Sequence, residues 1–85
     1  MKWGLALTNP ARHVLRDAPR ADVAQIDVAL REMEDDPLAG DVKFLRGTHH
    51  TLRRRVGAWR ILYELRPERR LIVVLDVMRR DSNTY

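Results

Sequence analysis

The sequence predicts an α+β fold in which an N-terminal strand and a helical hairpin precede a three-stranded, mainly antiparallel sheet, in the order β-α-α-β-β-β. Helical periodicity is confined to residues 10–35, β-prone runs fill residues 42–78, and a Gly57-Ala58 turn joins two of those runs. Helices grouped before strands are typical of an α+β sandwich with the helices on one face. At 85 residues, we expect one domain spanning residues 1–85.

The first forty residues of the chain carry the strand and the two helices. Residues 3–7 (WGLAL) form a short strand candidate, and Asn9-Pro10 is typical of a helix start, with Asn9 as the N-cap. Pro19 separates two apolar stripes of helical spacing, and Asp35-Asp36-Pro37 with Gly40 ends the second helix. The stripes consist of Ala11, Val14, Leu15 and Ala18, then Val23, Ile26, Leu30 and Met33.

The remainder of the chain has the pattern of strands. Residues 42–45 form a short strand before a loop at residues 46–50, and residues 66–69 form a turn. The run Leu71–Leu75, inside residues 70–78 (RLIVVLDVM), predicts a central strand buried on both faces of the sheet.

Residues 52–63 (LRRRVGAWRILY) are the most informative segment, because they predict a β-hairpin with an unusual face. The two-residue turn sets Val56 opposite Trp59 and Arg55 opposite Arg60. Alternation then places Leu52, Val56, Trp59, Ile61 and Tyr63 on one face, with Arg54 as the odd member. The other face carries Arg53, Arg55 and Arg60, which we call the arginine face. Like charges directly opposite each other destabilise a hairpin, so this face favours a polyanionic ligand such as a phosphate backbone.

The charge distribution is compatible with such a ligand. The net charge is +4, from sixteen Lys and Arg against twelve Asp and Glu, and the basic residues concentrate in the C-terminal half. Arginine matches phosphate with a planar, bidentate fork, which indicates a nucleic-acid footprint or an acidic partner. An arginine-rich coding bias, a solvated sheet face and a protein-binding surface are the alternatives.

The composition also excludes several classes of site. There are no cysteines, so we expect neither disulfides nor a cysteine-based zinc site, and the adjacent His49 and His50 are not a metal motif. We expect no metal and no cofactor. No run approaches the ~20 apolar residues of a membrane span, and no N-terminal secretion signal is evident, so we expect a cytoplasmic protein.

Three segments together carry a family resemblance: the helical hairpin ending in Asp35-Asp36-Pro37, the segment Asp41–Gly47 (K-x-L-x-G) and the segment Arg53–Tyr63 (R-x-R-x-G-x-[YW]-R-[IVL]-x-Y). The end of the chain, from Arg79 to Tyr85, adds a basic–acidic–tyrosine terminus. On these motifs the chain resembles the RelE/ParE toxin superfamily of bacterial type II toxin–antitoxin systems. RelE-like members of that superfamily cut mRNA in the ribosomal A site, whereas ParE-like members poison DNA gyrase.

The resemblance implies a site for metal-independent RNA cleavage. It implies catalytic roles for Arg53, Arg55, Arg60, Arg80 and Tyr85, and phosphate binding by the same arginines together with Arg79 and Lys43. Many relatives have lysine on the first hairpin strand and a histidine or lysine near the position of Met78. Proton transfer therefore falls on Tyr85, or on His49 or His50, which are otherwise residues of a solvated loop.

The sequence thus favours a ribosome-dependent mRNA endoribonuclease in which a 2′-hydroxyl attacks the adjacent phosphate. The alternatives are a ParE-like gyrase inhibitor and a non-catalytic nucleic-acid-binding module. The resemblance implies mRNA, the ribosome and an antitoxin with an acidic, amphipathic segment as partners. We further expect Glu64 to neutralise Arg53 or Arg55, and Trp59 to lie in the core or to stack on a base.

Overall fold

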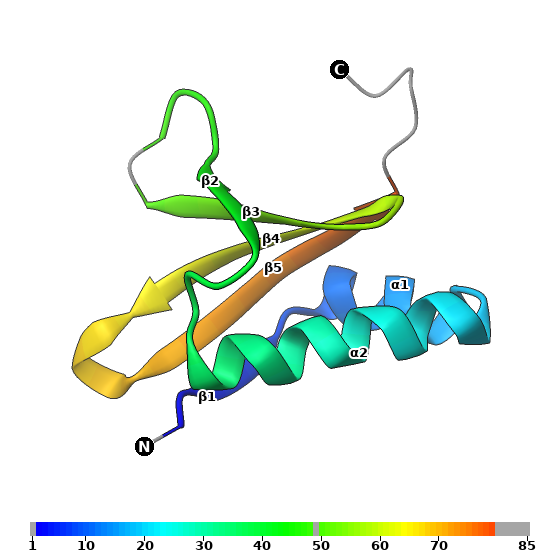
Figure 1. The fold of residues 1–85 in the computed structure, drawn as a ribbon, viewed down its shortest axis with the longest axis horizontal. Helices are drawn as coiled ribbons and strands as arrows, with labels where there is room; N and C mark the ends of the chain where they lie inside the picture. Colours follow the sequence, from blue (N-terminus) through cyan, green and yellow to red (C-terminus); the bar gives the residue numbers. More distant parts are fainter. Residues whose placement is uncertain (1, 49, 80–85) are drawn as a thin grey trace.

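The computed structural model describes residues 2–48 and 50–79, so His49, Arg80 and Tyr85 lie outside the described residues. The elements follow one another as β1 (Gly4–Leu7), α1 (Asn9–Asp17), α2 (Arg20–Asp35), β2 (Asp41–Phe44), β3 (Thr51–Val56), β4 (Trp59–Arg66), a 3-10 turn (Pro67–Arg69) and β5 (Leu71–Arg79). The strands form one five-stranded sheet in the order β1-β5-β4-β3-β2. Both helices lie on the same side of this sheet (Figure 1).

The α+β class and the mainly antiparallel sheet are confirmed. Within the described residues, β1 and β5 are the only strands that pair in parallel, and the other three pairings are antiparallel. The short strand expected at residues 42–45 forms as β2 at residues 41–44 and pairs with β3. With this strand, the described residues form four strands after the helices, one more than the order β-α-α-β-β-β gives.

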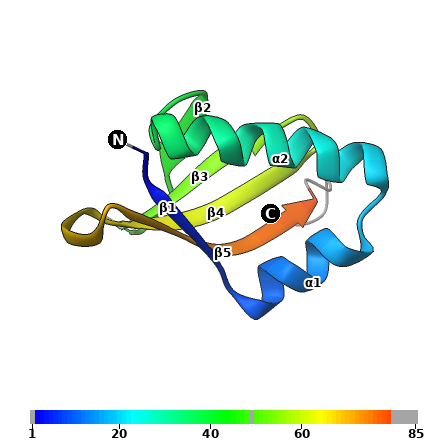
Figure 2. The same ribbon diagram turned by 90° about the horizontal axis from the view of Figure 1, so that it is seen from below.

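The helix layer follows the predicted apolar stripes, with one correction at its start. Thr8, and not Asn9, is the N-cap of α1, because its hydroxyl oxygen accepts a hydrogen bond from the Ala11 amide at 3.3 Å. The same hydroxyl donates to the Leu75 carbonyl of β5 at 2.5 Å, so the cap also ties α1 to the sheet. Figure 2 shows α2 crossing over β3 and β4, with α1 beside β5.

The core lies between the two helices and one face of the sheet. Helix residues Ala11, Ile26, Ala29, Leu30 and Met33 pack against strand residues Leu52, Trp59, Ile61, Tyr63, Ile72, Val74 and Val77. Burial of this apolar area is the main force that holds the layers together. No helix among residues 2–48 and 50–79 is long and apolar enough to span a membrane.

The expectation that β5 is buried on both faces is wrong. Ile72 and Val74 are fully buried, whereas Leu71, Val73 and Leu75 between them are half-buried. The reason is that both helices cover the same side of the sheet. We call the opposite side the open face, and it is the side available to a large ligand.

Candidate nucleic-acid interface

The hairpin of β3 and β4 forms in the predicted register. Val56 pairs with Trp59, Arg55 with Arg60 and Arg54 with Ile61. Gly57 takes a φ of +56° in the turn, a conformation that side chains with a Cβ rarely adopt. The register fixes which side of the sheet each residue of the hairpin faces.

The arginine face lies on the open face of the sheet. Trp59, Ile61 and Leu52 are in the core under the helices, so alternation turns Arg53, Arg55 and Arg60 the other way. Arg55 is exposed, and Arg53 and Arg60 are half-buried. Lys43 of β2 is the register partner of Arg53, so it lies on the same face and is exposed. Four predicted phosphate ligands are therefore brought onto one surface.

Acidic side chains pair with basic residues of this side of the sheet in combinations that the sequence did not predict. Asp41 of β2 is the register partner of Arg55, and its Oδ1 lies 3.5 Å from Nη1 of Arg53. Glu64 was expected to neutralise Arg53 or Arg55, but it pairs with Arg66 at 2.9 Å and accepts a hydrogen bond from the Thr51 hydroxyl at 3.4 Å. The carboxylate that pairs with Arg53 is that of Asp41.

The end of β5 turns Arg79 away from the arginine face. Met78 is the register partner of Arg60, whereas Arg79 is the partner of Trp59, and its guanidinium carbon lies 5.8 Å from the Trp59 ring centroid. Arg79 thus makes a cation–π contact at the helix-covered side. Trp59 is only 6% exposed, so its ring belongs to the core and is not presented to a base.

Of the histidine candidates, His50 is described, and it does not lie at the turn of the hairpin. His50 is exposed and lines an apolar hollow with Leu38, Phe44, Leu52 and Leu65, at the start of β3. Arg55 and Arg60 flank the turn at the other end of that strand. Among the residues that the structure describes, no group of three or more His, Asp or Glu side chains is placed to hold a metal ion.

Comparison with known proteins rests on structure, since no protein-family model and no curated sequence matches the chain. The archaeal RelE–RelB complex from Pyrococcus horikoshii OT3 superposes with a TM-score of 0.83 at 22% identity, covering 96% of this chain and 99% of that chain. The RelBE2 toxin–antitoxin complex from Mycobacterium tuberculosis gives 0.82 at 28% identity, covering 94% and 100%. The isolated E. coli RelE toxin gives 0.82 at 18% identity, covering 96% and 88%.

The chain has the RelE toxin fold. This confirms the fold that the motifs implied. Likeness of fold does not by itself transmit an activity, so the role of each site residue still rests on the geometry of this chain.

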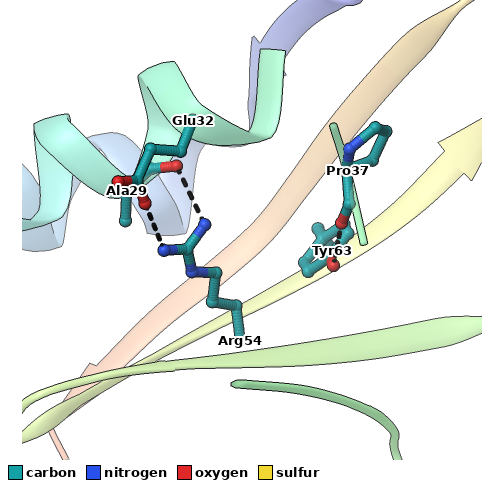
Figure 3. A network of polar contacts seen from close by, with 5 residues as sticks. All are labelled: Ala29, Glu32, Pro37, Arg54 and Tyr63. Carbon is teal, nitrogen blue, oxygen red and sulfur yellow. Dashed lines mark hydrogen bonds and ion pairs between the residues drawn. The ribbon is translucent and has the colours of Figure 1, made fainter. Parts of the chain in front are cut away.

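Within this RelE fold, Arg54 is the residue whose surroundings sequence reasoning missed. It is 8% exposed under α2, where its guanidinium donates to the Ala29 carbonyl at 3.4 Å and to Oε1 of Glu32 at 2.5 Å (Figure 3). An arginine within an apolar alternation is itself a signal that the covering helix must supply acceptors, because an unpaired buried charge is costly.

Tyr63 of β4 makes a second buried polar contact beside Arg54. Its hydroxyl donates to the Pro37 carbonyl at 2.5 Å, in the connection between α2 and β2 (Figure 3). Burial raises the pKa of Tyr63 to about 12, with the nearby Arg54 charge acting in the opposite direction. Tyr63 is therefore a neutral hydrogen-bond donor at physiological pH.

Proposed function

We propose that this chain is the toxin of a type II toxin–antitoxin system and acts as a ribosome-dependent mRNA endoribonuclease. The observation that carries the proposal is the arginine face, with Arg53, Arg55 and Arg60 together on the open side of a RelE fold. The fold supports the toxin role, and the cations support a phosphate backbone as the ligand.

The chemistry suited to this face is attack of a 2′-hydroxyl on the adjacent phosphate. The transition state concentrates negative charge on the phosphate oxygens, and fixed guanidinium groups stabilise such charge. Arg60 is proposed to hold the scissile phosphate, with Arg53 and Arg55 on its neighbours. The arginine guanidinium is already protonated at neutral pH, so these residues bind negative charge and do not act as bases.

Proton transfer is assigned by resemblance to residues outside the described part of the chain. Tyr85 is proposed as the general base, and Arg80 as the general acid or second phosphate contact. A tyrosine pKa is ordinarily about 10, so neighbouring cations are required to lower it. The expected products are a 2′,3′-cyclic phosphate and a 5′-hydroxyl end.

The proposed protein partner is an antitoxin with an acidic segment that covers the arginine face. Several of the similar structures are complexes of a RelE toxin with RelB. An acidic segment is complementary to the arginine face, and the same charges would then be withheld from RNA.

The test is primer extension on a reporter mRNA in a reconstituted translation reaction, with and without ribosomes. We expect cuts at codon positions only when ribosomes are present, because the ribosome orients the message. Arg60→Ala is expected to slow cleavage by a factor on the order of 100, the usual cost of removing one group that stabilises transition-state charge. Tyr85→Phe is expected to slow it as well.

Arg69→Ala is the matched control, because Arg69 is an exposed arginine in the turn between β4 and β5. It is expected to cleave like the unmodified protein. A folded protein that arrests growth without cutting message would contradict the proposal and favour the gyrase-inhibitor alternative, which a supercoiling assay then tests.

A further inference from the structure

The edge strand of the sheet brings a carboxylate, that of Asp41, to the arginine face. Asp41 in β2 is the register partner of Arg55, while its side chain contacts Arg53. Nη1 of Arg53 lies 3.5 Å from both the Oδ1 and the backbone carbonyl oxygen of Asp41. The side chain of Arg53 is 16% exposed and that of Asp41 is 51% exposed, so the pair is open to solvent on the acidic side. Asp41 therefore lies next to two of the proposed phosphate ligands.

The position of Asp41 depends on the segment before it, which is held from beneath by the side chains of Arg54 and Tyr63. The Tyr63 hydroxyl binds the Pro37 carbonyl. Arg54 lies against Gly40, where an added Cβ would come within 2.8 Å of its Cζ and Nε atoms. Gly40 also takes a φ of +82°, which favours glycine. The connection is thus fixed at two points, and Gly40 immediately precedes Asp41.

The guanidinium of Arg54 is also bound to α2. Its two terminal nitrogens donate to Ala29 and Glu32, as Figure 3 shows. The contacts of Arg54 and Tyr63 with Ala29, Glu32, Pro37 and Gly40 together form what we call the buried clamp. It links α2, the α2–β2 connection and β3, and it therefore sets where β2 places its carboxylate.

We propose that Asp41 is a built-in counter-ion of the arginine face, held in position by the buried clamp. This inference rests on the proposed function, since it concerns how the same face discriminates among anions. An incoming phosphate must take the place of Asp41 beside Arg53. An exposed ion pair is worth a factor of up to about five in an equilibrium constant, which disfavours a single small anion. A chain of phosphates that also contacts Arg55 and Arg60 displaces the carboxylate.

The direct test is Asp41→Asn, which keeps the shape of the side chain and removes its charge. Affinity for a short single-stranded RNA is measured over a series of salt concentrations. We expect binding to tighten about threefold to fivefold. We expect the slope of log K against log salt to steepen by up to about 0.7, because Arg53 becomes fully available to one more phosphate.

Asp17→Asn is the matched control, with the same change in net charge. Asp17 pairs with Arg16 at 3.3 Å in α1, on the helix side of the sheet. Asp17→Asn is expected to change the RNA affinity by less than about twofold. It is expected to leave the salt slope unchanged within error. An equal gain in both variants would overturn the proposal, because it would reduce the Asp41 effect to net charge.

A double-mutant cycle tests the positioning role of the clamp. Arg54→Leu removes the guanidinium contacts, and Glu32→Gln is the milder alternative if the leucine variant does not fold. In the unmodified background, either change is expected to shift RNA affinity towards that of Asp41→Asn. In the Asp41→Asn background, the same change is expected to have no further effect. Additive effects would overturn the positioning role, since they would show that the clamp does not act through Asp41.

Inorganic tripolyphosphate separates this inference from the proposed function. If the protein does not bind RNA at all, the proposed function fails, while tighter tripolyphosphate binding by Asp41→Asn still supports the counter-ion. If Arg60→Ala loses RNA binding but Asp41→Asn binds RNA and tripolyphosphate no more tightly than the unmodified protein, the counter-ion is refuted and the proposed function stands.

Discussion

Strand β3 carries three consecutive arginines, and the middle one has a different environment from its neighbours. Arg54 is 8% exposed and bonded to α2, whereas Arg55 is exposed near the hairpin turn. The residue type is the same, and the only difference is which face of the sheet it occupies. The helix layer, and not the identity of the side chain, therefore decides whether an arginine of β3 is structural or available to a ligand.

The burial of Arg54 also helps to determine the register of the hairpin. A one-residue slip of β3 would turn Arg53 and Arg55 under α2 and expose Arg54. A buried guanidinium is tolerated only where acceptors meet it, and those acceptors are the Ala29 carbonyl and Glu32 beneath Arg54. The contacts of the buried Arg54 with α2 thus favour the register that leaves Arg53 and Arg55 on the open face.

Truncating Arg54 should destabilise the protein far more than truncating its exposed neighbour Arg55. Arg54→Ala removes both contacts with α2 and leaves a cavity, so we expect the free energy of unfolding to fall by about 2–3 kcal/mol. Arg55→Ala should change it by less than about 0.5 kcal/mol, because its side chain is exposed. Urea denaturation of both variants checks this, and equal losses would show that the two faces do not differ as described.

The pH dependence of stability should depend on Tyr63. Its pKa is about 12 in the folded protein and about 10 in the unfolded chain, so the unfolded chain loses the proton first. The stabilisation is fully present below pH 10 and is lost as the pH rises from 10 to 12, by about 2 kcal/mol. Tyr63→Phe should flatten this decline and cost about 1 kcal/mol at neutral pH. Denaturation at pH 8 and pH 11 measures it, and an unaltered decline in the variant would contradict the assignment.

Removing Arg55 should affect the ligand and not the fold. We expect Arg55→Ala to weaken binding of single-stranded RNA about fivefold to tenfold, uniformly across sequences. The salt slope should decrease by about 0.7, as expected for one lost phosphate contact. Fluorescence anisotropy at several salt concentrations measures both quantities, with Arg69→Ala as the control. An unchanged slope would place the RNA elsewhere on the protein.

Replacing Arg54 with leucine should lower the free energy of unfolding by less than truncating it to alanine. An apolar side chain of comparable length fills much of the space between β3 and α2, and buried ion pairs are often replaced in this way at little cost. We expect Arg54→Leu to stay within about 1 kcal/mol of the unmodified protein in urea denaturation. A loss as large as that of Arg54→Ala would show that the guanidinium contacts, and not the packed volume, hold α2 on the sheet.

Local patterns predicted the hairpin, its register and the arginine face, because a two-residue turn and a period of two determine them within one short segment. The partners of the charged residues were not predictable in the same way. Arg54 meets Glu32 from α2, and Arg53 meets Asp41 from β2, at positions set by how separate elements pack. The prediction that Glu64 pairs with Arg53 or Arg55 was wrong, because Glu64 pairs with Arg66, two residues further along the same strand.

Two further differences between the predicted and the observed structure also arise from how separate elements pack together. Thr8 and Asn9 are both good capping residues, and the Leu75 carbonyl, distant in sequence, provides a second partner for the threonine. The apolar run in β5 is compatible with one or two covered faces, and only the placement of both helices on one side decides the matter.

In the proposed function, the open face of the sheet binds RNA through its arginines. Titrating a short single-stranded RNA into the isotope-labelled protein, and following the Nε–Hε resonance of each arginine by NMR, tests this most directly. We predict the largest shifts at Arg55 and Arg60, with little change at Arg12, Arg16 and Arg31 of the helices. Shifts that are largest at those helical arginines, and absent from the arginine face, would contradict the account.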